Sequence, residues 1–192
     1  RSLDFAVTQE PVTAVQLSRG KAEAQLLFEI HLLMSDCGRL ASDLVLFATR
    51  EFAFVELPEE MTTGSSIMPQ KRNPDLFELV RGRGATSLGL LVEALAIPAK
   101  LPSGYHRDLQ YTKAPVIRGF SHGLAALALV PALMSSLVWE AAAIEAAMEP
   151  SMHATDLALE FARNGRPFRE AYGKAADPAQ WREKSALESL QA

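Results

Sequence analysis

The stretch that decides the fold is "QLLFEIHLLMSDCGRLASDLVLFA", residues 25–48. Apolar or small residues recur along and just after it at steps of three and four, at Leu26, Ile30, Leu33, Cys37, Leu40, Leu44 and Ala48. This spacing is typical of one face of an α-helix. We therefore predict a helix over about residues 16–52, which at about 1.5 Å per residue would be on the order of 50 Å long. A helix of that length needs long partner helices to bury its apolar face.

Two further segments predict such partners. Residues 76–97 repeat the helical pattern, and Pro98 ends it. A third helix is predicted over 113–149, with Pro115 tolerated in the first turn and Pro131 producing a kink. No alternating run of apolar and polar residues predicts a sheet. The fold class expected is therefore all-α, a bundle of long helices.

The end of the chain has a different pattern. Ser151 is a candidate N-cap, Gly165 a candidate helix stop, and Pro167 a candidate helix start. These signals predict a short helix hairpin. We expect a central bundle domain over residues 1–149 and a small helical domain over 150–192.

The composition limits the classes of function. The chain has 192 residues, of which 48% are hydrophobic, so it can bury a substantial core. Its 19 cations and 23 acids give a net charge of −4, and no basic face for nucleic acid is expected. Cys37 is the single cysteine, which excludes an intrachain disulfide and fits a reducing compartment. No histidine has the spacing of a metal ligand, and neither a metal nor a cofactor is expected.

One uncharged run, residues 119–139, is as long as a membrane span. Its Ala, Gly and Ser content, Pro131 and the absence of charged flanks on both sides favour a buried helix of a soluble bundle instead. We also expect the chain to be a piece of a longer protein, because it has no initiating Met and no signal pattern.

The first polar loop is "GSSIMPQKRNPD", residues 64–75, within a predicted loop over 61–75 that we call the signature loop. Its glycine, paired serines, adjacent Lys71 and Arg72, and Asn73 suit the binding of an anion. The spacing of a P-loop and that of a serine-hydrolase elbow are both absent. From these residues alone, a solvated polar connector is an equally good interpretation.

A second polar loop, residues 98–112, lies on the other side of the predicted helix 76–97. Its end and the residue that follows read "GYHRDLQYTK", residues 104–113, again with hydroxyl, amide and cationic donors beside a glycine. Two such loops flanking one helix are expected to meet at one end of a bundle.

Together these motifs resemble a known family. "GSSIMPQKRNPD" is similar to the signature of the fumarase/aspartase superfamily, and Gln70, "SGYHRDLQYTK" and "ATDLALEFARNGRPFREAY" resemble the argininosuccinate lyase family. The resemblance runs along almost the whole chain. Members of that family also have a large N-terminal portion and a longer C-terminal tail.

The resemblance implies a role for each matching residue. Ser65 would be the general base, Ser66 a neighbouring substrate-contacting serine that competes for that role, and Lys71 and Asn73 would hold the fumarate-side carboxylates. Tyr105, Gln110 and Lys113 would contact substrate from the second loop. The family's acidic pair before that lysine is replaced by Tyr111 and Thr112, a departure that affects the local contacts.

The implied reaction is the β-elimination of argininosuccinate to arginine and fumarate, a step of arginine biosynthesis in the cytoplasm. The family fold implies a homotetramer whose active sites combine loops from several chains, so this chain alone is expected to be inactive. Two alternatives stay open: a relative acting on another substrate, such as the fumarate-releasing adenylosuccinate lyase or an enzyme acting on carboxymuconate, or a non-catalytic structural relative such as a lens crystallin.

Overall fold

The computed structural model describes residues 11–181, and within them the chain divides into two compact units. The first extends to Val138, apart from Phe52–Phe54, and the second follows from Trp139. We expect the domain boundary near Pro150, and that boundary stays a prediction. Each unit is described by itself below.

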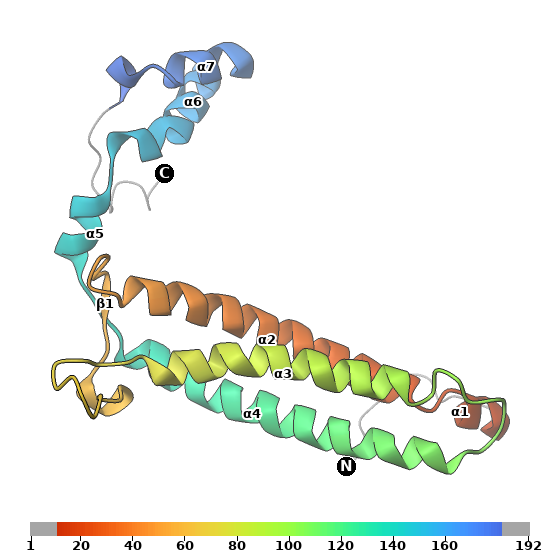
Figure 1. Cartoon of the computed structure of the whole chain (residues 1–192). Coiled ribbons are helices and arrows are strands. Elements are labelled where there is room, and N and C mark those ends of the chain that lie inside the picture. The colour runs from red at the N-terminus through yellow and green to blue at the C-terminus, as the bar shows by residue number, and fades with distance from the viewer. Residues whose placement is uncertain (1–10, 182–192) are drawn as a thin grey trace. The chain divides into compact units, whose positions relative to one another are not determined.

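The first unit is built on three long helices that lie side by side (Figure 1). These are α2 (Lys21–Phe47), α3 (Asp75–Ala96) and α4 (Lys113–Ser136), preceded by the short α1 (Val12–Leu17). Two 3₁₀ turns, η1 (Glu59–Met61) and η2 (Arg107–Thr112), lie in the connections. The short strands β1 (Val55–Glu56) and β2 (Val138–Trp139) pair with each other. The all-α class predicted from the sequence is confirmed.

Two of the predicted helices are too long. Gly20 interrupts the first with a φ of +89°, in the left-handed region, and its N–H donates to the Glu23 carboxylate at 2.8 Å. A side chain at Gly20 would come within 2.9 Å of the Pro98 ring, so glycine also fits the close approach. The third helix ends at Ser136 instead of 149, because Leu137 is extended and leads into β2.

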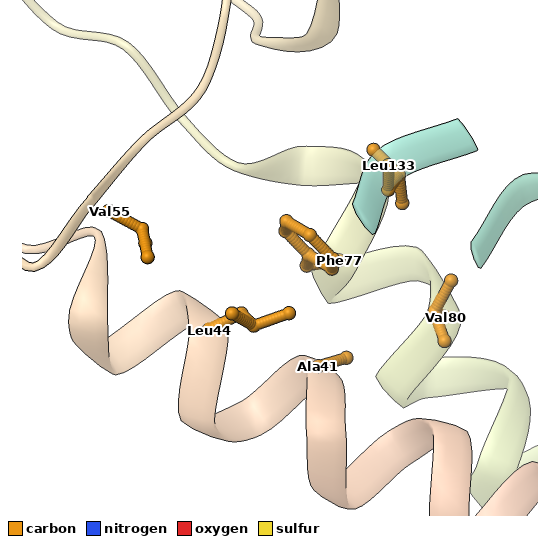
Figure 2. Packing of buried hydrophobic residues seen from close by; sticks show 6 residues of the cluster. All are labelled: Ala41, Leu44, Val55, Phe77, Val80 and Leu133. Atoms are coloured by element: carbon orange, nitrogen blue, oxygen red, sulfur yellow. The ribbon is translucent and has the colours of Figure 1, made fainter. Parts of the chain in front are cut away.

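The core of the first unit holds α2, α3 and α4 together. One cluster contains the buried side chains of Ala41, Leu44, Val55, Phe77, Val80 and Leu133, which come from all three helices and from β1 (Figure 2). A second cluster, nearer the other end of the helices, contains Ala24, Leu27, Leu90, Leu91 and Ala94. Burying a side chain such as Phe77 contributes about 1.5–3 kcal/mol to stability. The bundle is therefore fixed at two levels along its length.

The buried face of α2 is not the face that its sequence pattern predicts. Leu26, Leu33 and Leu40 belong to the predicted face, yet they are 47%, 38% and 38% exposed. The residues that are buried are Ala24, Leu27, Met34, Gly38, Ala41 and Leu44. The helix was predicted correctly but its buried face was not, because α2 carries apolar residues on more than one face. The second apolar face is open within this chain.

The uncharged run predicted to be buried is only partly so. The segment Arg107–Ser136 is long and apolar enough to cross a membrane by length and composition alone, a test that core helices of soluble proteins also pass. Only 22% of its most apolar window is buried within the structure. Ile117, Leu124 and Leu127 remain 69%, 64% and 44% exposed. The α4 helix therefore also has an apolar face that this chain leaves uncovered.

The second unit contains the predicted helix hairpin. Its elements are α5 (Ala141–Ala147), η3 (Pro150–His153), α6 (Ala154–Arg163), α7 (Phe168–Ala175) and η4 (Pro178–Gln180). The turn between α6 and α7 uses Gly165 at a φ of +89° and an extended Pro167, as the sequence predicts. The predicted cap at Ser151 is wrong, because that residue lies inside η3 and α6 begins after His153.

Replacing Gly119 by alanine should destabilise the first unit. The new methyl group would overlap the Leu27 Cδ2 atom, and this side chain, which is 1% exposed, would have to shift within the core. We expect a loss of about 1–2 kcal/mol in the free energy of unfolding, measured by denaturant titration. Gly82→Ala is the matched control, since nothing lies within 4 Å of the added atom, and it should gain about 0.5–1 kcal/mol. Equal stabilities would contradict the packing described here.

Cys37 should react slowly with alkylating reagents. Burial, and secondarily the charge of Asp36, raise the pKa of its thiol above the ordinary value. Because the thiolate is the reactive form, a raised pKa lowers the reactive fraction at any pH below it. We expect the pH at half-maximal rate of iodoacetamide labelling to lie above that of a free cysteine peptide. A midpoint at or below the peptide's would disprove this.

Candidate functional site

Thr63 and Asn73 are hydrogen-bonded to each other across the base of the signature loop, and we call this pair the neck. The N–H of Thr63 donates to the carbonyl of Asn73 at 3.1 Å, and the N–H of Asn73 donates back to Thr63 at 2.8 Å. The Thr63 hydroxyl also donates to the carboxylate of Asp75, the first residue of α3. Residues 64–72 are therefore held at both ends, next to the start of α3 and the core side chain of Phe77.

Ser65 lies at the start of this loop, with its hydroxyl oxygen turned toward the backbone. Its Oγ accepts hydrogen bonds from the N–H groups of Ile67 and Met68, each at 3.2 Å. Donors that point at an oxygen favour its negatively charged form. Ser66 is exposed and has no such pair of donors among the described residues. The geometry therefore distinguishes the two serines, which the sequence alone does not.

The two adjacent cations of the loop have different surroundings. The Arg72 guanidinium pairs with the Glu59 carboxylate at 2.6 Å and also lies 3.4 Å from the carbonyl of Pro69. The Lys71 side chain is exposed and has no ion-pair partner among the described residues. Its backbone N–H donates to the carbonyl of Met68 at 3.0 Å, which tightens the turn. Glu59 was not predicted as part of the site, because no local pattern links it to Arg72.

A cavity of about 370 Å³ separates the signature loop from the end of α2. Its walls include three cations, Arg50, Lys71 and Arg72, and one acid, Glu78, and the rest come from Val45, Ala48, Thr49, Met68, Gln70 and Pro74. A volume of this size suits a small ligand. Ser65 and Asn73 do not line it, although Asn73 is partly buried at the neck. The cavity therefore gathers positive charge beside the loop and does not contain every residue predicted for the site.

The second loop presents its predicted residues near the start of α4. Tyr105 is 55% exposed beside Gly104, whose φ is +116°. Gln110 is half-buried within η2, and Lys113 is the exposed first residue of α4. These three residues are close in sequence and lie in the same part of the bundle.

Thr112, one of the two departures from the family motif, has a structural explanation. It is 1% exposed, and its hydroxyl donates to the carbonyl of Leu109 at 2.8 Å and lies 3.5 Å from the Glu23 carboxylate. The threonine hydroxyl therefore bonds within η2 and also lies close to Glu23 of α2. Its neighbour Tyr111 is 73% exposed and points away from the core.

The two loops do not meet, which corrects the expectation from the sequence. They lie at opposite ends of α3 (Figure 1), a helix of 22 residues. At about 1.5 Å per residue this helix holds them roughly 30 Å apart. The structure thus brings Ser65, Lys71 and Asn73 together on one loop. It keeps Tyr105, Gln110 and Lys113 at the other end of the bundle.

Comparison with known proteins shows what this chain is similar to. A family model described as lyase matches residues 2–89, which include the whole signature loop. The chain is 50% identical over 178 residues to an argininosuccinate lyase of Xylella fastidiosa, covering 93% of this chain and 40% of that protein. It is also 50% identical over 176 residues to an argininosuccinate lyase of Sorangium cellulosum, covering 92% of this chain and 41% of that protein.

The fold is also similar to that of solved structures. The structure of a protein described as fumarate lyase:delta crystallin from Brucella melitensis, bound to cobalt, aligns with a TM-score of 0.61. It is 18% identical to this chain, and the alignment covers 92% of this chain and 41% of that one. The chain spans about 40% of the length of the curated relatives named above.

Proposed function

We propose that the chain carries part of the machinery that cleaves argininosuccinate to arginine and fumarate, because it is 50% identical to two argininosuccinate lyases over more than nine-tenths of its length. The reaction is a β-elimination that breaks a carbon–nitrogen bond. The identity of 50% across more than nine-tenths of the chain supports this substrate over adenylosuccinate or carboxymuconate. The observation that carries the proposal is the signature loop, which holds a serine with two backbone donors and a lysine that has no ion-pair partner among the described residues.

The elimination needs a base and a set of positive charges. Ser65, acting as its alkoxide, takes the proton from the carbon β to the departing nitrogen, which leaves a dianion resembling an enediolate. The carbon–nitrogen bond then breaks to give fumarate, and the departing nitrogen takes up a proton as arginine leaves. Serine is a weak base in water, and the two N–H groups directed at its Oγ support its anionic form. Lys71 and Asn73 then hold the developing charge, and losing one such donor costs about 3 kcal/mol of transition-state stabilisation. Ser66 contacts the substrate.

The site is completed by a second copy of the chain. Tyr105, Gln110 and Lys113 bind the substrate, but they lie at the end of α3 opposite Ser65. An antiparallel pairing of bundles brings the second loop of one copy to the signature loop of another. We extend this to a homotetramer in which the exposed apolar faces of α2 and α4 pack between copies.

The remaining parts of the proposal follow from the same family. The enzyme takes part in arginine biosynthesis and works in the cytoplasm, where its single cysteine stays reduced. Its partners are a small-molecule substrate and further copies of itself, with no nucleic acid or membrane and no metal or cofactor. Residues 1–192 alone do not turn over substrate, because they correspond to only about 40% of the length of the argininosuccinate lyases they match.

Ser65→Ala should abolish fumarate formation in the full-length enzyme. Fumarate release is followed by its ultraviolet absorbance, with argininosuccinate as substrate. Removing the base should lower kcat by roughly three orders of magnitude or more, since it is needed in the transition state. Ser66→Ala is the matched control and should keep most of kcat. The assignment is falsified if Ser65→Ala retains kcat, and release from adenylosuccinate alone would transfer the proposal to that substrate.

Mixing two inactive variants should restore activity if sites are shared. Ser65→Ala removes the base on the signature loop, and Gln110→Ala removes a contact on the second loop. After refolding together in equal amounts, about a quarter of sites should combine two intact loops, because copies associate at random. We expect about a quarter of wild-type kcat from the mixture, and none from either variant or from residues 1–192 alone. No recovery, with oligomers formed normally, would rule out shared sites.

A further inference from the structure

We propose that Arg72 and Glu59 form a brace that holds the signature loop in its turned conformation, and that the neighbouring Lys71 is the cation left to meet substrate. Arg72 and Glu59 are thus positioning residues. The brace itself is a property of the chain, whereas the role of Lys71 rests on the proposed function.

The contacts of Arg72 span the whole loop. One Nη atom pairs with the Glu59 carboxylate at 2.6 Å, and so ties the loop to η1, which precedes it. The other Nη lies 3.4 Å from the carbonyl of Pro69 and 3.5 Å from that of Lys71. One guanidinium therefore connects residue 59, before the neck, with two carbonyls at the tip of the loop. The contact with Glu59 ties the loop to the preceding segment, and the contacts with the two carbonyls restrict the loop's own backbone.

The chemistry of the guanidinium explains why one side chain can do this. Its planar fork presents donors in fixed, divergent directions, whereas a lysine ammonium is a single point of charge. With these acceptors around it, Arg72 has little capacity left for a substrate carboxylate. Lys71 has the opposite surroundings, since its side chain is exposed without an ion-pair partner among the described residues. The two adjacent cations therefore divide positioning and binding between them.

The brace acts on the same turn that orients Ser65. The Ser65 Oγ is held by the N–H groups of Ile67 and Met68, and Met68 accepts from the N–H of Lys71. Pro69, which Arg72 contacts, lies directly between these bonds in sequence. Releasing Arg72 should therefore loosen both the donors around Ser65 and the turn that precedes Lys71. The expected effect is small per contact, because the Glu59 and Arg72 side chains are 78% and 46% exposed.

Hydrogen exchange of the loop amides tests the brace without any substrate. Peptides covering residues 62–73 are followed by mass spectrometry in the purified chain and in Glu59→Gln. We expect exchange in Glu59→Gln to be about two- to five-fold faster, the range that an exposed charge pair supports. Arg72→Lys should lie between wild type and Arg72→Gln. Peptides from α2 and α3 should not change, which shows that the bundle remains folded.

Two matched controls isolate the pair. Glu60→Gln removes an adjacent acid of η1 for which no partner is found among the described residues, and Lys71→Gln removes the adjacent cation. Neither should alter loop exchange. Added salt should speed exchange in the wild type, because it screens an exposed ion pair, and should have no such effect in Glu59→Gln.

The outcomes separate the brace from the proposed lyase function. Unchanged exchange in Glu59→Gln, or an equal rise in Glu60→Gln, would refute the brace even if the full-length enzyme releases fumarate. Faster exchange confined to Glu59 and Arg72 variants would support the brace even if no fumarate forms. If no fumarate forms, the proposed function is wrong, and the substrate-binding role of Lys71, which depends on that function, is wrong with it.

Discussion

The packing of α3 against α2 and α4 is the constraint on which the rest of the structure depends. Phe77 and Val80, one turn inside α3, are buried against Ala41 and Leu44 of α2 and Leu133 of α4. Asp75, at the start of the same helix, bonds to Thr63 and closes the neck of the signature loop. The core therefore extends without interruption into the base of the loop. The neck fixes the loop at its base, and the contacts of Arg72 with Glu59 and with Pro69 lie beyond that neck.

The same helix also separates the two polar loops. Its length follows from an uninterrupted apolar pattern that ends at Pro98, and a rigid helix of 22 residues cannot bring its ends together. Apolar side chains also remain exposed along α2 and α4, such as Leu26 and Ile117. The exposed apolar faces and the separated loops are the two observations that support the assembly of several copies proposed above.

Electrostatics gives the signature loop its internal order. Lys71 and Arg72 are adjacent and carry the same charge, yet Arg72 pairs with Glu59 and lies near two backbone carbonyls, while Lys71 has no ion-pair partner among the described residues. The difference arises from where η1 places Glu59, thirteen residues earlier in the chain. No pattern within the motif "QKRNP" contains that information, and for this reason the sequence treats the two cations alike.

Sequence by itself determined the main elements of this protein: its all-α class, the long helices predicted at about 16–52 and 76–97 and found as α2 and α3, and the loop between them. It did so because these features depend on local spacing, on prolines and on glycines. It also identified Ser65, Lys71 and the second-loop residues as candidates, through a motif whose residues are contiguous. Only the tertiary structure decided which face of α2 is buried, since that helix is apolar on two sides and packing chooses between them. It also decided that Ser65 has backbone donors, that Arg72 is paired, and that the two loops lie at opposite ends of a helix. Each of those facts depends on residues distant in sequence, whose approach is set by packing of the whole bundle.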